Sequence, residues 1–442
     1  MLRYCLQLAW RSLLRTPVAS GLMVLAIGLG IGASMTMLTV LHVMSRDPLP
    51  GRSQTLYTPH LDPLPRDLPR SREWADPSDN LTWPDAMALL HAGPAVHQAA
   101  MASGQSLIWP VQAANTPLDL NGRYATAGFF ALFGIPLQRG GSWSRQDDQD
   151  HTRVIVLSQT LANTLFGLRD PIGQTVAVGE QRIGFRVIGV IGKWNPQPLF
   201  YADPSRKGAF GDQDDFFLPL STAMELKLDA GTSISSWDPH SDNDVKHLQS
   251  PSTSWLQFWV QLDTPQQVAA YQRFLYDYAA TQHASGRFQR PPQTARLYSL
   301  MDWLQHLQMV PDDLRLQTLL ALGFLWICLI NVIALLLAKF LRRSGEIGVR
   351  RALGARRGHV MLQFGTEAVL IGVVGGLMGT AIAEAGLWSV RQRPDDYAGL
   401  AHLDAPMLLT TVALAIVAAL LAGLLPAWRA SRINPALQVK DL

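Results

Sequence analysis

The sequence predicts an integral membrane α-helical protein with four transmembrane helices and a large α+β extracytoplasmic domain inserted between helices 1 and 2. Four stretches hold no ionisable side chain, and a helix needs roughly 20 apolar residues to cross the hydrocarbon core. These stretches are residues 18–41, 316–338, 368–383 and 405–428. A long polar segment separates the first stretch from the other three, and basic residues cluster on one side of all four.

The basic flanks of these stretches predict the orientation, because cytoplasmic loops carry the excess of lysine and arginine. They are Arg3, Arg11 and Arg15, then Lys339, Arg342, Arg343, Arg350, Arg351, Arg356 and Arg357, and then Arg429, Arg432 and Lys440. We therefore expect both termini in the cytoplasm and residues 45–315 outside the cytoplasmic (inner) membrane. The net charge is only +3, and its asymmetry indicates membrane lipid, not nucleic acid, as a partner.

The element boundaries follow from the same pattern. We expect a cytoplasmic amphipathic helix over 1–17, transmembrane helices over 18–44, 316–338, 363–388 and 405–428, the extracytoplasmic domain over 45–315, a cytoplasmic coupling loop over 339–362, an external loop over 389–404 and a cytoplasmic tail over 429–442. Residues 1–17 either lie along the inner membrane surface or serve only as a basic flank. The first span is read as an anchor, because its apolar run exceeds the ~7 to 15 residues of a signal-peptide core.

The external segment alternates between predicted helices and strands. Residues 46–80 are rich in Pro, Arg and Asp and read as an extended surface segment, and 193–253 read as an insertion or long loops. A helix capped by Ser158 is expected through Phe166. A stalk helix near the domain's end is expected to continue, with a kink, into the second span. Neither cysteine of the chain lies between residues 45 and 315, so disulfides cannot hold this domain.

Small residues in two spans have the spacing that lets helices approach closely. They are Gly28 and Gly32 in the first span and Gly372, Gly375, Gly376 and Gly379 in the third. They are predicted to form packing surfaces within one subunit or across a dimer. Asn331, inside the second span, needs a hydrogen-bond partner either across such a dimer or within its own bundle. Glu384, late in the third span, is expected at the membrane interface.

The sequence gives no indication of catalysis or of a bound cofactor. It contains no Gly-x-x-x-x-Gly-Lys-Ser/Thr loop to hold ATP phosphates. No serine, cysteine or carboxylate pair stands in a catalytic context, so we expect a non-catalytic membrane subunit. Asp238, His240, Asp242, Asp244 and His247 crowd one external stretch. They lack a defined ligand spacing, which favours a solvated acidic loop over a metal site.

A helical motif fills the predicted cytoplasmic loop. Glu346 precedes Arg350 by four residues, a favourable pairing, and Gly354 ends a small apolar face that includes Leu353. The whole block reads Glu346-Ile347-Gly348-Val349-Arg350-Arg351-Ala352-Leu353-Gly354-Ala355.

This block resembles the MacB/FtsX-like permeases of ABC transporters. Further matches are Gln363-Phe364 with Glu367, the glycines of the third span, the tail from Pro426 to Leu437, and external blocks that resemble the MacB-like periplasmic core domain, including Phe129–Pro136, Val154–Ser158 and Pro171–Gly173. The four-span pattern with its large first loop agrees.

The resemblance implies that Glu346, Ile347, Arg350, Arg351, Leu353 and Gly354 form the surface that docks an ABC ATPase subunit, which holds ATP and Mg. In the alternative reading, the arginines only orient the helices and contact lipid phosphate. MacB itself carries a fused ATPase, whereas this chain is expected to use a separate one.

The resemblance further implies a dimer with a second permease, identical or related, and mechanotransmission through the membrane that drives efflux. A periplasmic adaptor and an outer-membrane channel are expected partners. Lipoprotein release and FtsX-like regulation of a cell-wall hydrolase are the alternatives. The cargo is not encoded in any recognisable pattern.

Overall fold

The computed structural model describes residues 2–68, 79–110, 116–202, 210–238 except 212, 247–342, 357–393, and 398–421 except 405, 412, 416 and 419. It divides into two compact units, which we call the membrane unit (residues 1–45 and 310–442) and the outer unit (residues 46–309). The predicted docking residues Glu346, Ile347, Arg350, Arg351, Leu353 and Gly354 lie outside the described residues, as do His240, Asp242 and Asp244.

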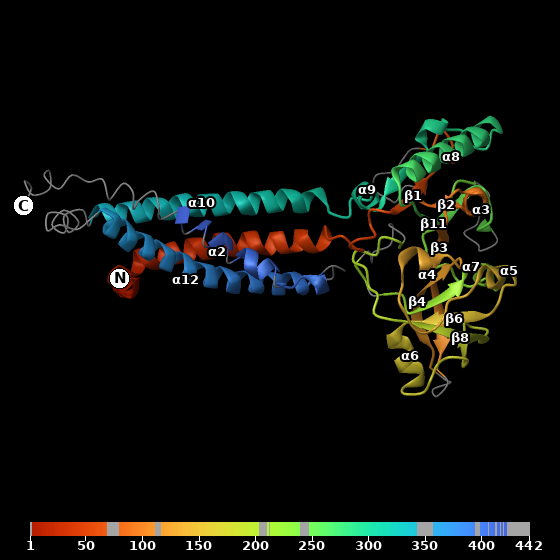
Figure 1. The fold of residues 1–442 in the computed structure, drawn as a ribbon, viewed down its shortest axis with the longest axis horizontal. Coiled ribbons are helices and arrows are strands. Elements are labelled where there is room, and N and C mark those ends of the chain that lie inside the picture. The colour runs from red at the N-terminus through yellow and green to blue at the C-terminus, as the bar shows by residue number, and fades with distance from the viewer. Residues whose placement is uncertain are drawn as a thin grey trace, which may run out of the picture. The chain divides into compact units, whose positions relative to one another are not determined.

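The membrane unit consists of helices (Figure 1). Their bounds are α1 Leu2–Arg15, α2 Pro17–Met44, α10 Asp312–Arg342 and α12 Arg357–Arg391, with a 3₁₀ turn at Ala398–Leu400 and a short apolar helix at Pro406–Ala415. Among the described residues, three helices are long and apolar enough to span a membrane: Pro17–Met44, Asp312–Arg342 and Met361–Arg391. The short helix falls within the predicted fourth span, which is only partly described.

The ends of these helices follow local rules. Pro17 stands in the first turn of α2, where its missing N–H costs nothing. α12 continues past both Glu367 and Glu384, so it is longer than the uncharged stretch 368–383. Glu384 Oε1 accepts a hydrogen bond from Arg391 Nη2 at 2.6 Å. Arg391 is the last residue of α12 and lies in the predicted external loop. This ion pair gives the acid a partner within its own helix.

The outer unit has a mixed sheet with helices. Its strands are β1 Leu56–His60, β2 Leu81–Thr82, β3 His97–Trp109, β4 Leu118–Ala125, β5 Leu137–Gly140, β6 Val154–Leu157, β7 Thr175–Val178, β8 Ile183–Ile191, β9 Phe216–Pro219, β10 Ser235–Ser236, β11 Thr253–Gln261 and β12 Arg296–Ser299. Its helices are α3 Trp83–Ala92, α4 Phe129–Phe133, α5 Arg145–Gln149, α6 Gln159–Phe166, α7 Leu220–Glu225, α8 Pro265–Ala284 and α9 Leu300–His306, with a 3₁₀ turn at Pro292–Thr294.

The strands follow the order β12-β1-β11-β3-β4-β9-β6-β8-β5, with β2 and β10 paired to β11 and β7 paired to β3 and β8. The pairs β4–β9 and β6–β8 are parallel, and the other pairs are antiparallel. In β11, Phe258 and Val260 belong to one buried cluster and Trp259 to another. Because successive side chains of a strand point to opposite faces, the sheet has a core on each face.

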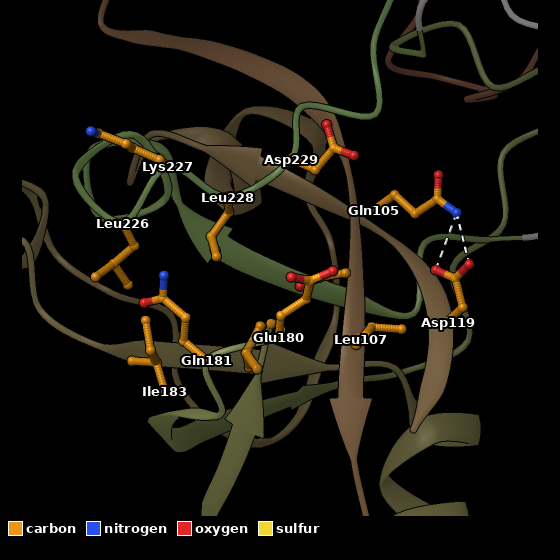
Figure 2. Close-up of a pocket in the computed structure, with 13 residues that line it drawn as sticks. Gln105, Leu107, Asp119, Glu180, Gln181, Ile183, Leu226, Lys227, Leu228 and Asp229 are labelled. Carbon is orange, nitrogen blue, oxygen red and sulfur yellow. Dashed lines mark hydrogen bonds between the residues drawn. The ribbon is translucent and has the colours of Figure 1, made fainter. Parts of the chain in front are cut away.

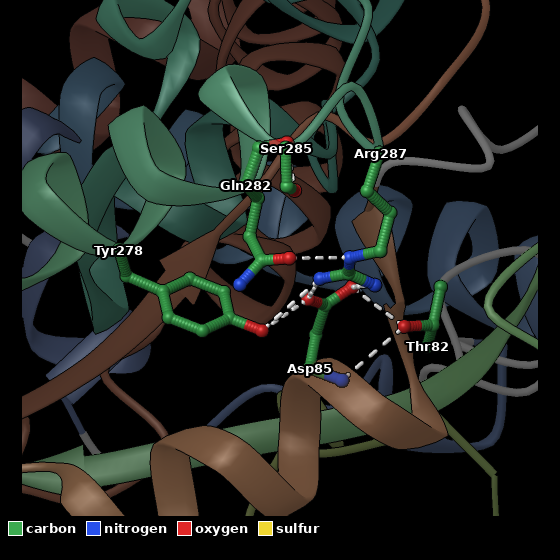
Figure 3. Close-up of polar contacts among 6 residues, drawn as sticks. All are labelled: Thr82, Asp85, Tyr278, Gln282, Ser285 and Arg287. Carbon is green, nitrogen blue, oxygen red and sulfur yellow. Dashed lines mark hydrogen bonds and ion pairs between the residues drawn. The ribbon is translucent and has the colours of Figure 1, made fainter.

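A buried carboxylate fastens α3 to α8 (Figure 3). Asp85, fully buried, accepts hydrogen bonds from the hydroxyl of Tyr278 at 2.7 Å and from Thr82 Oγ1 at 2.5 Å, and it forms an ion pair with Arg287. Burial raises the pKa of Tyr278 above its ordinary value, with the Asp85 charge adding to the effect. The hydroxyl therefore stays protonated and continues to donate to Asp85.

Ser158 caps α6, as predicted, through a hydrogen bond from Leu161 N. The region 46–80 differs from the predicted surface segment, because β1 and residues 61–64 are buried. The predicted insertion 193–253 supplies β9, which lies inside the sheet between β4 and β6. The predicted stalk is also interrupted, since α9 ends at His306 and α10 begins at Asp312. The two helices belong to different units.

Candidate functional site

Glycines let α2 and α12 pack backbone to backbone. A methyl group added at Gly32 would lie 2.5 Å from Ile382 Cγ2 and 3.2 Å from the carbonyl oxygen of Gly379. At Gly375 it would lie 2.7 Å from Ile27 Cγ2. Real Cβ atoms do not approach this closely, so only glycine fits at these positions.

The other predicted glycines lie in the same bundle. Added methyl groups would contact Met378 at Gly28, Ile31 at Gly379 and Ala415 at Gly376, while Gly372 is buried. Gly28, Gly32, Gly375 and Gly379 thus lie where α2 and α12 pack against each other within the chain, and a role of the glycines in a dimer stays a prediction. Asn331 differs, because its side chain is exposed on α10, whereas Leu329 and Val332 of the same helix are buried.

A buried ion pair joins α10 to α12. The ammonium of Lys339 contacts Oε1 of Glu367, and the side chains of the two residues are only 5% and 3% exposed. The rings of Phe340 and Phe364 pack beside them, 4.1 Å apart. Lys339 lies one turn before the end of α10 and Glu367 three turns into α12, so the pair spans the two helices that bracket residues 343–356.

Two serines extend this pair to the other helices. Ser12 Oγ, on α1, donates a hydrogen bond to Glu367 Oε1 at 2.7 Å, and Lys339 Nζ donates to Ser20 Oγ, on α2, at 3.4 Å. We call Ser12, Ser20, Lys339 and Glu367 the polar clamp. A buried ion pair depends on additional hydrogen bonds to offset the cost of burying its charges, and each serine supplies one of them.

Sequence reasoning missed the clamp. Lys339 read as one more basic flank residue and Glu367 as a family-motif residue, whereas the two serines gave no signal at all. One indication of a pair was present in the sequence: Lys339 directly follows the second uncharged stretch, and Glu367 directly precedes the third.

The outer unit has a separate polar cavity of about 440 Å³ (Figure 2). Three carboxylates line it, from Asp119 in β4, Glu180 in the turn after β7, and Asp229 after α7, together with Lys227. The amide of Gln105 donates to both carboxylate oxygens of Asp119, at 3.0 and 3.1 Å. Three acids against one lysine give this cavity a negative potential, which suits a cation or a hydrogen-bond donor.

Two family models match this chain. The one described as "MacB-like periplasmic core domain" matches residues 20–274, and the one described as "FtsX-like permease C-terminal" matches residues 318–435. The chain belongs to the MacB/FtsX-like permease family. It is an ABC transporter permease with a MacB-like periplasmic core domain, and its outer unit is an extracytoplasmic segment of a membrane protein.

Curated relatives of this permease include macrolide and pyoverdine export proteins. The "Macrolide export ATP-binding/permease protein MacB" of Rhodospirillum rubrum is 30% identical over 97% of this chain and 59% of that protein. MacB of Neisseria meningitidis is 24% identical over 70% of this chain and 41% of that protein. The "Pyoverdine export ATP-binding/permease protein PvdT" of Pseudomonas savastanoi is 28% identical over 70% of this chain and 40% of that protein. The permease thus spans about half the length of these relatives.

Solved structures similar to this permease are also known. The periplasmic region of MacB from Actinobacillus actinomycetemcomitans is 15% identical with a TM-score of 0.35, covering 60% of this chain and 98% of that one. The extracellular domain of the transporter YknZ from Gram-positive bacteria is 17% identical with a TM-score of 0.32, covering 51% and 95%.

Proposed function

We propose that this chain is the permease subunit of a MacB-like ABC exporter in the inner membrane, with four spans and cytoplasmic termini. A separate ABC ATPase, which holds ATP and Mg, docks on residues 343–356. Its nucleotide cycle moves the helices, and the extracytoplasmic domain responds by expelling cargo from the outer side.

The polar clamp is the observation that carries this proposal. The loop that would receive the ATPase connects α10 to α12, and Lys339 and Glu367 hold these two helices together beside it. A push on the loop therefore displaces both helices as one body. The bonds to Ser12 and Ser20 pass the displacement to α1 and α2, which leads into the outer unit in the chain.

Export as the output is supported by the relatives, which are named for export of a macrolide and of pyoverdine. A second permease, identical or related, completes the transporter. Asn331 supports this arrangement, because an amide on an apolar membrane helix needs a hydrogen-bond partner, and within the described residues Asn331 is exposed on the surface of α10. A periplasmic adaptor and an outer-membrane channel would carry the cargo onward.

The docking assignment is tested with Glu346→Gln and Leu353→Asp in the native complex. We expect both variants to insert normally but to lose cargo export and the permease-dependent stimulation of ATP hydrolysis, because each removes a contact between the loop and the ATPase. Glu384→Gln is the matched control, since it removes an acid at the other end of α12. Unchanged export and stimulation in both loop variants would refute the docking surface.

The same complex separates export from the two alternatives. Co-purification with a periplasmic adaptor is expected for an exporter. Recovery of a cell-wall hydrolase on the outer unit, with no cargo released, would instead assign the regulatory function. Release of lipoproteins from membranes would assign the extraction function.

A further inference from the structure

Three metal-ligating side chains converge in the outer unit from distant parts of the chain. His60 ends β1, Asp79 lies two residues before β2, and His306 ends α9. One ligand atom from each lies within 4.8 Å of the other two. The side chains of His60 and Asp79 are only 8% and 7% exposed, and that of His306 is 35% exposed.

Both imidazoles face the same carboxylate oxygen. Nε2 of His306 lies 2.9 Å from Asp79 Oδ1, a hydrogen-bond distance. Nε2 of His60 lies 3.8 Å from the same oxygen, too far for a hydrogen bond. Ligand atoms around a tetrahedral zinc ion, each about 2.0 to 2.2 Å from the metal, stand about 3.3 Å apart. The two separations from Asp79 Oδ1 lie on either side of this value, and the two imidazoles offer ligand atoms within 4.8 Å of each other.

Aromatic rings hold the histidines in this arrangement. The His306 ring is stacked against Tyr298 at 4.9 Å and against Trp303 at 5.3 Å. Tyr298 also meets the His60 ring edge to face at 5.9 Å. Because these contacts fix the imidazoles before any ligand binds, little ordering entropy remains to oppose coordination.

We propose that His60, Asp79 and His306 bind a divalent transition-metal ion, with Zn²⁺ the best fit. Two imidazoles and one carboxylate are ligands typical of zinc sites, in which three protein ligands leave a fourth position for water. Mg²⁺ and Ca²⁺ prefer oxygen ligands and do not suit two nitrogens. The exposed edge of His306 leaves the fourth position accessible from solvent.

The ion would tie the segment before β2 to α9. α9 is the last helix of the outer unit, and the chain passes from it to α10. The metal would thus act as a removable crosslink within the outer unit. One of the two linked segments, α9, is the last helix of that unit before α10 in the sequence.

The test titrates Zn²⁺ into the metal-stripped full chain in detergent, against a chromophoric zinc chelator. We expect saturation at one ion per chain, an increase in Tm on zinc binding, and no comparable effect of Mg²⁺. Asp79→Asn and His306→Gln each remove one ligand and should weaken binding by more than about tenfold. His283→Ala is the matched control, since that imidazole is not among the three proposed ligands and its Nδ1 is hydrogen-bonded to the carbonyl oxygen of Phe288.

His306→Gln decides the outcome if Asp79→Asn fails to fold, because the partly exposed imidazole tolerates replacement. Equal zinc affinity in the wild type and His306→Gln would overturn the proposal, leaving a hydrogen-bonded triad and adventitious binding by surface histidines. Absence of saturable binding in the wild type would overturn it as well. These measurements need no ATPase, so they are independent of the proposed export function.

Discussion

At the scale of single residues, charged groups inside the outer unit are matched to partners. The buried guanidinium of Arg123 binds both carboxylate oxygens of Asp214, at 3.0 and 3.2 Å, and lies over the Tyr201 ring.

Asp148 is different. Burial raises its pKa from 3.8 to about 6, although Ala127 N donates a hydrogen bond to it at 2.7 Å. Burial therefore disfavours the charged form of this carboxyl, which is neutral below about pH 6 and ionised above it.

Asp148→Asn is expected to stabilise the protein at pH 8 by about 1 to 2 kcal/mol. Since the pKa is raised in the folded state, the contribution of Asp148 is fully present below about pH 3.8 and is lost as the pH rises through about 6. Asparagine stays neutral and still accepts from Ala127. Thermal unfolding at pH 4.5 and pH 8 checks this, with exposed Asp150→Asn as the control. A gain in Tm that is the same at both pH values would contradict the assignment.

At the scale of elements, two kinds of packing organise the chain. The outer unit buries alternate residues of its strands on two faces, so the sheet determines where its helices lie. Lipid is as apolar as the side chains of a membrane helix, so the hydrophobic effect does not drive the helices of the membrane unit together. Their association depends on close van der Waals packing. α2 carries glycine on the side that meets α12, whereas Gly21 of the same helix faces open space.

This asymmetry predicts different outcomes for two leucine substitutions in α2. Gly32→Leu should destabilise the bundle by about 1 to 3 kcal/mol, because the new side chain collides with Ile382 and the backbone of Gly379. A Cβ added at the exposed Gly21 meets nothing within 4 Å, so Gly21→Leu should leave stability unchanged. Heating the purified permease and following the folded fraction by gel filtration compares the two. Equal stability of both variants would show that α2 and α12 do not pack through Gly32.

At the scale of the whole molecule, the polar clamp connects four helices through two charges and two hydroxyls. Burying both charges costs several kcal/mol that their attraction offsets only when the pair is intact. Such a pair is weak evidence of stability. Its value lies in fixing one arrangement of α10 and α12, which the proposed transmission of movement from the ATPase requires.

Removing one charge of the clamp is therefore expected to be costly. Glu367→Gln or Lys339→Met removes the attraction between the two charges while the other charge stays buried, and should destabilise the membrane unit by about 3 to 5 kcal/mol. The exchange Lys339→Glu with Glu367→Lys restores a pair and should recover part of the stability and of the coupled ATP hydrolysis. Arg342→Gln, on the exposed end of α10, is the control. Wild-type melting and coupling in Glu367→Gln would rule out the clamp as a mechanical link.

Much of the fold could be predicted because its signals are local. Uncharged stretches indicate the membrane helices, Ser158 caps α6, and Pro17 begins α2. The prediction of buried and exposed segments was weakest where a segment with a polar composition is buried in the structure. Residues 56–64 contain proline, histidine and aspartate and read as surface, yet they form β1 and a buried continuation, with Asp62 paired to Arg290.

The sequence by itself determined the class, the apolar spans and the family, because hydropathy and short motifs depend only on neighbouring residues. Only the tertiary structure decided which distant side chains meet. Ser12 contacts Glu367 across 355 residues, and His306 contacts Asp79 across 227. Such contacts depend on how whole helices and strands pack. The sequence around each of these residues gives no signal of the contact, because a histidine or serine looks like any other polar residue until its distant partner is known.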